Sequence, residues 1–175
     1  RVEDFRAIPH LPPLNQGATL FCWSFSTSGF IESEMQRLGL EPVRLSVFYP
    51  VSYLFLEKAK LCIRTRGQSR FGPGDLFSGV LDIIKEYGTI PAAVYGGAKE
   101  EVPANHAELY RELEQYMASV KARATWHEGP ILQRVQALLS KYLGKPPTTF
   151  AYKGQTFSPQ SFFKEVLTLP WNEYV

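Results

Sequence analysis

Cysteine and histidine are scarce in this 175-residue chain, which contains two cysteines and three histidines. Two cysteines are too few for the disulfide framework of a small secreted domain. No apolar run is long enough to span a bilayer, and the chain has neither an internal repeat nor a low-complexity segment. It also begins without a methionine or a signal peptide, so we expect Arg1 to be the start of a processed or trimmed chain.

A strong excess of either charge is missing as well. The formal net charge of +2 does not by itself indicate a surface for nucleic acid or membrane. The locally basic cluster of Arg64, Arg66 and Arg70 is expected to be a solvated loop. In contrast, 45% of the residues are hydrophobic and 14% aromatic, which is enough to bury a sizeable core. We expect a soluble globular protein, either cytoplasmic or exported after removal of an N-terminal segment.

Cys22 stands at the expected start of an apolar helix, where a thiol can become reactive. Unpaired N–H groups and the positive end of the helix dipole favour the thiolate there. Gln16 precedes it, and the small residues from Gly17 to Thr19 allow the loop to fold back toward the thiol. An amide side chain and the Cys22 N–H can together stabilise a carbonyl oxygen under attack. The alternative interpretation is a buried core thiol with Gln16 on a surface loop.

The segment around Cys22 resembles the active-site segment of the papain-like cysteine peptidases. The shared pattern is Gln16, five further residues and then Cys22-Trp23-Ser24-Phe25. The resemblance implies that Cys22 is the nucleophile and that Gln16 supplies the oxyanion-hole side chain. It also implies an α+β, papain-like fold, of which this chain supplies mainly the helical half. Papain has a glycine- and cysteine-rich loop where this chain has residues 18–21, so the disulfide-forming cysteine of that loop is absent.

Further segments are similar to one branch of those enzymes, the bleomycin hydrolases and bacterial aminopeptidases C. The matching segments follow the order of that family along nearly the whole chain: Leu45-Ser46, Ser52-Tyr53-Leu54-Phe55, residues 86–91, residues 143–150 and residues 157–163. The resemblance implies that residues 1–175 are the N-terminal portion of such a peptidase. It also implies a C-terminal, sheet-rich half with the catalytic histidine and asparagine, which this chain does not contain.

The apolar spacing predicts a mostly helical chain with few strands. Residues 1–14 contain three prolines and are expected to be an extended lead-in. A helix from Cys22 is expected to end near Gly39, others before Gly88 and Gly144, and a short one to be capped by Ser158. By the resemblance, the helical pair at 105–143 is an insertion relative to papain that serves in assembly.

None of the three histidines is expected to be the catalytic base. His10 lies in the extended lead-in, His106 is expected to be a solvated first-turn residue, and His127 falls in a turn between two helices. We therefore expect the base on a second polypeptide, the C-terminal half, that stays bound after a cut following Val175. Autoproteolysis is one origin of such a cut, because a flexible loop near a working active site is easily cleaved. The alternative is a sequence that simply stops at Val175.

Substrate binding is expected at Trp23, Gly74 and Asp75. Papain-like enzymes hold an extended substrate against a Gly-Gly pair, and Phe71-Gly72-Pro73-Gly74-Asp75 falls where that pair belongs. Asp75 replaces the second glycine and is expected to favour a basic residue or a free α-amino group. The other interpretation makes Asp75 the cap of a helix that begins at Leu76.

The leading prediction is therefore a cysteine peptidase, an aminopeptidase or an endopeptidase, that acts through a thioester on Cys22. The chemistry requires no metal and no organic cofactor. The expected partners are a peptide substrate, the second polypeptide and further copies of the chain in a homo-oligomer. Two alternatives stay open: a non-catalytic relative that acts as a binding or assembly protein, and an acyltransferase of the same fold.

Overall fold

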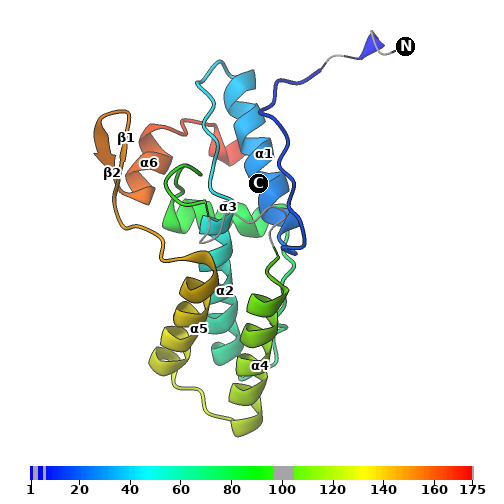
Figure 1. Ribbon diagram of the computed structural model, residues 1–175, viewed down its shortest axis with the longest axis vertical. Coiled ribbons are helices and arrows are strands. Elements are labelled where there is room, and N and C mark those ends of the chain that lie inside the picture. The colour runs from blue at the N-terminus through cyan, green and yellow to red at the C-terminus, as the bar shows by residue number, and fades with distance from the viewer. Residues whose placement is uncertain (2–3, 6, 97–104, 175) are drawn as a thin grey trace.

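The computed structural model describes residues 1, 4–5, 7–96 and 105–174. The described part is mostly helical, with one small sheet, which is consistent with an α+β fold (Figure 1). Its elements are α1 (Cys22–Arg37), α2 (Phe48–Arg64), α3 (Phe77–Tyr87), α4 (Ala107–Arg123), α5 (Glu128–Leu143), β1 (Phe150–Tyr152), β2 (Gln155–Phe157), α6 (Pro159–Glu165) and the short 3₁₀-helix η2 (Trp171–Glu173).

Helix α1 begins at Cys22, as the sequence predicts, and ends through a glycine. Gly39 has a φ of +72°, a conformation that glycine adopts without a Cβ clash. Its N–H donates to Gln36 O at 3.1 Å, and the Leu40 N–H donates to Met35 O at 2.8 Å. These two bonds form a Schellman motif, which satisfies the last carbonyl groups of the helix. The expected C-terminal role of Gly39 is confirmed.

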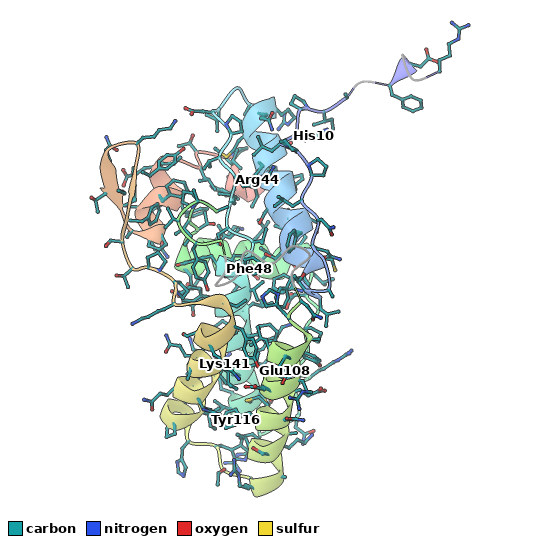
Figure 2. All side chains as sticks on the ribbon, in the orientation of Figure 1. His10, Arg44, Phe48, Glu108, Tyr116 and Lys141 are labelled. Atoms are coloured by element: carbon teal, nitrogen blue, oxygen red, sulfur yellow. The ribbon has the colours of Figure 1, made fainter. Side chains whose placement is uncertain are left out.

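Helix α2 is central to the molecule and packs against α1, α3 and α5 (Figure 1). Most of the apolar residues of α2 are buried, because the helix has neighbours on several sides. The Ser24 hydroxyl of α1 donates to Val47 O at 2.6 Å, which joins α1 to the start of α2. Figure 2 shows Phe48, the first residue of α2, near the middle of the molecule.

Helices α4 and α5 pack against each other beside the lower half of α2 (Figure 1). Their apolar stripes are buried as the spacing predicts: Leu109, Leu113, Met117 and Val120 in α4, and Ile131, Val135, Leu138, Leu139 and Leu143 in α5. On the surface, the Lys141 ammonium pairs with the Glu112 carboxylate at 2.6 Å. The helical pair at 105–143 therefore exists, while its status as an insertion relative to papain stays a prediction.

The small sheet is an antiparallel hairpin that leads directly into α6. Phe150 pairs with Phe157, and the turn between the strands has positive φ at both Lys153 and Gly154. Ser158 then caps α6 with a reciprocal capping box to Ser161, and Pro159 occupies the first turn. The predicted cap is confirmed.

Gly88 connects α3 to α6 through a close backbone contact. It ends α3 with a φ of +79°, and a Cβ added there would lie 2.2 Å from the backbone of Pro159. The next amide, Thr89 N–H, donates to Pro159 O at 3.2 Å. Only a glycine allows the two segments to approach this closely. Across the described ranges, no helix is long and apolar enough to cross a bilayer.

Candidate functional site

Cys22 is the first residue of α1, and its side chain is exposed. The residue before it, Phe21, occupies the N-cap position but provides no side-chain hydrogen bond to the helix. The first N–H groups of an α-helix have no partner within the helix, so this end of a helix favours an anion. This is the exposed arrangement predicted for a thiol nucleophile, and it differs from the alternative of a buried core thiol.

The loop before Cys22 has a tightly fixed and strained backbone. The Asn15 carboxamide accepts the Gly17 N–H at 2.9 Å, and the Thr19 hydroxyl accepts the Phe21 N–H at 3.3 Å. Gly17 and Leu20 both have positive φ, of 58° and 63°. Positive φ is uncommon for leucine and costs conformational energy, and such strain is concentrated at functional sites.

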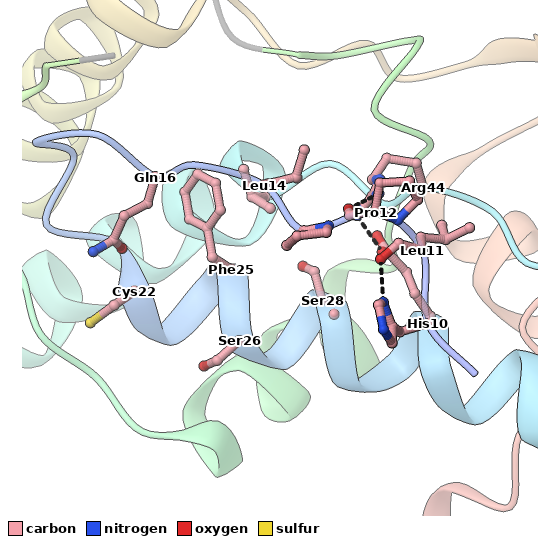
Figure 3. Close-up of a pocket in the computed structure, with 14 residues that line it drawn as sticks. His10, Leu11, Pro12, Leu14, Gln16, Cys22, Phe25, Ser26, Ser28 and Arg44 are labelled. Atoms are coloured by element: carbon pink, nitrogen blue, oxygen red, sulfur yellow. Dashed lines mark hydrogen bonds and ion pairs between the residues drawn. The ribbon is translucent and has the colours of Figure 1, made fainter. Parts of the chain in front are cut away.

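Gln16 and Cys22 lie at the same end of α1 (Figure 3). Gln16 is half-buried, and its side-chain oxygen is buried without a hydrogen-bond partner in the part of the chain that the structure describes. Both residues line one groove with a volume of about 400 Å³. The structure therefore brings the two residues of the predicted oxyanion hole to one wall of one groove.

The groove runs along α1 beneath residues 10–14 of the lead-in. Its other walls come from Phe25, Ser26 and Gly29 of α1 and from Arg44 and Val47 before α2. Cys22 lies at one end and His10 at the opposite end (Figure 3). Gly29 leaves open space on its helix face, since a Cβ added there would meet nothing within 4 Å. The groove is thus shaped for a ligand or chain segment lying along the helix.

An ion pair between buried Glu32 and half-buried Arg44 forms the end of the groove away from Cys22. The Arg44 guanidinium donates to the Glu32 carboxylate at 2.8 Å and to Pro12 O at 2.5 Å. The other carboxylate oxygen of Glu32 accepts the Leu45 N–H at 2.8 Å. Burial raises the pKa of Glu32, and these two donors partly oppose that shift. The pair fastens the lead-in to α1 and so defines the groove wall.

Trp23 is buried, and it holds the glycine loop at residues 71–75. Its indole N–H donates to Pro73 O at 2.7 Å. The Lys58 ammonium binds the same loop, with bonds to Gly72 O at 3.0 Å, to Gly74 O and to the Asp75 carboxylate at 3.1 Å. These three acceptors use all three of its donors. Substrate binding by Trp23 and Gly74 stays a prediction. The contact of Lys58 with this loop was not predicted from the sequence.

Asp75 is part of this charged cluster and does not cap α3. One carboxylate oxygen accepts the N–H of Leu76 and the other pairs with Lys58. Helix α3 begins at Phe77 with Leu76 as its N-cap and with no side-chain cap bond. The interpretation of Asp75 as a cap of a helix beginning at Leu76 was therefore wrong. Its proposed preference for basic groups stays a prediction, although Lys58 already balances its charge.

The three histidines lie in three different settings. His10 is exposed in the lead-in, where its Nδ1 is 2.9 Å from Leu11 O. His127 is exposed at the N-cap position of α5, in the turn between helices where the sequence places it. His106 is buried, with 9% of its surface exposed, so the expectation of a solvated first-turn residue was wrong. Its ring packs against Phe21 and Phe48, which desolvate it.

The described residues contain no group of three or more potential metal ligands. Among solved structures, the chain is similar to PepW from Lactobacillus rhamnosis HN001, with a TM-score of 0.63 and 20% sequence identity. The match covers 93% of this chain and 46% of the PepW chain.

At this sequence identity the likeness to PepW shows the fold alone. The chain spans about half the length of that protein. No protein-family model and no curated protein matches the sequence.

Proposed function

We propose that the chain is the N-terminal portion of a papain-like cysteine peptidase that hydrolyses peptide bonds through a thioester on Cys22. The main support is the exposed Cys22 at the first position of α1, with Gln16 beside it in the same groove. The strained loop before it and the order of motifs resembling the bleomycin hydrolases and aminopeptidases C add to this support. The fold similarity to PepW is consistent with it.

In this proposal the Cys22 thiolate attacks the carbonyl carbon of the substrate. The carbonyl oxygen becomes negative and is stabilised by the Gln16 amide and the Cys22 N–H. The C–N bond then breaks, a histidine protonates the leaving amine, and the acyl group remains on sulfur. Water hydrolyses this thioester, which releases a carboxylate and restores the thiol.

The histidine and the asparagine that orients it would come from a C-terminal half beyond Val175. In the described structure His10 lies at the far end of the groove, His127 lies on α5, and the His106 ring is enclosed by Phe21 and Phe48. The exposed face of α1 at Cys22, Ser26 and Gly29 leaves room for that half. Assembly into a homo-oligomer through α4 and α5 is a further part of the proposal.

The substrate side of the proposal concerns the glycine loop. Trp23 would act by holding Pro73, while Gly74 and the backbone of Asp75 would lie along an extended peptide. The Asp75 carboxylate would favour a basic residue or a free α-amino group, which would compete with Lys58 for it. Comparing Asp75→Asn with wild type on peptides with free and acetylated amino termini tests this: equal preferences in both proteins would overturn it.

The test of the proposed function is peptide hydrolysis by the full-length protein and its variants. Cys22→Ser should abolish turnover, whereas Cys62→Ser should retain it, because Cys62 is buried on α2. Gln16→Ala should lower kcat by about 10²–10³, the usual effect of losing one oxyanion donor. Full activity of Cys22→Ser, or no activity in the wild-type protein with every part present, would contradict the proposal and favour a non-catalytic relative.

A further inference from the structure

His106 is enclosed between two aromatic residues at the starts of helices, the N-cap residue of α1 and the first residue of α2. Its ring centroid is 5.4 Å from that of Phe21 and 5.3 Å from that of Phe48. Phe21 directly precedes Cys22, and Phe48 is the first residue of α2 and lies near the middle of the molecule (Figure 2). The imidazole therefore fills the space between the start of the Cys22 helix and the start of the central helix.

The backbone next to His106 is also attached to the loop before Cys22. Asn105 forms a parallel bridge with Ala18, and the His106 N–H approaches Ala18 O at 3.4 Å. Ala18 lies between Gln16 and Cys22, the two residues of the candidate oxyanion hole. The segment 105–106 thus contacts this loop twice, through its backbone at Ala18 and through the imidazole at Phe21.

The imidazole is held in a setting that suits only its neutral form. Its Nδ1 is buried and has no hydrogen-bond partner among the described residues. Burial lowers the pKa of His106. Among the described residues, the titratable groups on the surrounding elements have other settings: Cys22 is exposed, the Tyr49 hydroxyl donates to Tyr87 O, and Glu108 pairs with Arg111 at the surface.

We propose that His106 is a positioning residue and a proton-sensitive latch for the Cys22 segment. The neutral imidazole holds Phe21 against Phe48 and keeps residues 17–21 in place, and uptake of a proton releases this loop. The latch itself does not require Cys22 to be catalytic; its effect on catalysis rests on the proposed function. The His106 latch is a feature of the site in addition to the Cys22 thiol and the Gln16 oxyanion donor.

The direction of the pH effect follows from linkage. When the loop opens, His106 becomes solvated and regains its ordinary pKa of about 6.5. Between that value and the lower pKa of the closed state, only the open state binds the proton. The equilibrium constant for opening of the loop should therefore increase by up to roughly tenfold for each pH unit below about 6.5. Above that pH the loop should be insensitive to pH.

Hydrogen exchange of the full-length protein, followed by mass spectrometry from pH 8 to pH 5, tests this prediction. Protection of peptides covering residues 17–25, corrected for intrinsic exchange, should fall below about pH 6.5. His106→Phe keeps an aromatic ring without a titratable nitrogen, so its protection should not depend on pH. His127→Phe, which alters an exposed histidine at the start of α5, should behave like wild type. The same pH dependence in wild type and His106→Phe would overturn the proposal.

An NMR titration of the His106 ring in the wild-type protein gives an answer that does not depend on any variant folding. The ring should titrate below about 6.5, with the amides of residues 17–21 shifting at the same midpoint. Titration at or above that value, or amides that do not follow it, would overturn the latch. Labelling of Cys22 by an epoxysuccinyl probe in the same samples reports separately on the proposed function. Absence of labelling at every pH would contradict that function and leave the result on the latch intact.

Discussion

The indole N–H of Trp23 donates a hydrogen bond to the carbonyl oxygen of Pro73 at 2.7 Å. Trp23 is the second residue of the helix that Cys22 begins, and Pro73 lies in the glycine loop at residues 71–75. The same indole packs edge to face against Phe21 at 6.1 Å. One buried side chain therefore fixes helix α1, its N-cap residue and the glycine loop relative to one another.

Replacing Trp23 by phenylalanine should loosen this connection. The change removes the donor to Pro73 O and should lower the free energy of unfolding by about 1–3 kcal/mol, measured by urea denaturation. It should also slow the labelling of Cys22 by an epoxysuccinyl probe. Trp171→Phe is the matched control, because its indole donates to Leu167 O at 3.0 Å in another part of the fold. Equal effects of the two variants on labelling would contradict this account of Trp23.

Removing Glu32 should destabilise the fold and release the lead-in. Glu32→Ala leaves the Arg44 guanidinium and the Leu45 N–H without their carboxylate partner. We expect a loss of about 2–4 kcal/mol in unfolding free energy, together with faster proteolysis within residues 7–14. Glu108→Ala breaks the exposed pair with Arg111 and should cost much less, because both charges are solvated. Similar losses in the two variants would show that the Glu32 pair contributes no more than a surface pair.

The close contact at Gly88 should tolerate no side chain. Gly88→Ala combines a positive φ with a Cβ located 2.2 Å from the Pro159 backbone, so we expect a loss of more than about 3 kcal/mol. Gly154→Ala is the control, because Gly154 has a φ of +80° but open space around its Cβ position. Gly154→Ala should lower the free energy of unfolding by about 1–2 kcal/mol, which is the cost of a positive φ without a steric clash. Thermal unfolding of both variants measures the difference, and equal losses would contradict the contact.

Cys62 should react slowly and mainly at high pH. Burial raises the pKa of its thiol, so the thiolate forms at higher pH than it does for a solvated cysteine. Its alkylation by iodoacetamide in the native protein should keep rising above about pH 8.5. In urea, which unfolds the protein, the rate of Cys62 alkylation should increase to that of a solvated thiol. Rapid native alkylation of Cys62 near neutral pH would show that it is not enclosed by α2 and its neighbours.

Local signals in the sequence predict the helix boundaries well. Gly39, Gly88 and Ser158 act at the ends of α1, α3 and α6 as expected, because caps depend on a few adjacent residues. The exposed position of Cys22 at the start of α1 also follows from its local pattern. These features require little information about distant parts of the chain.

Contacts between distant segments explain what the sequence did not predict. A histidine beside a helix start is usually solvated, but His106 is covered by Phe21 and Phe48, which lie far from it in sequence. Lys58 is an ordinary helix residue until the fold brings the loop at residues 72–75 against it. Neither residue belongs to a short motif, so only the three-dimensional arrangement reveals its role.

The central claim is that Cys22 is a nucleophile, and selective covalent labelling tests it most directly. The full-length native protein is treated with an epoxysuccinyl thiol-protease probe, and the adduct is located by intact-mass and peptide-mass spectrometry. The account predicts one adduct, on Cys22, that is absent from Cys22→Ser and unaffected in Cys62→Ser. An intact, folded protein that carries no adduct on Cys22, or one that is labelled equally on Cys62, would contradict the account.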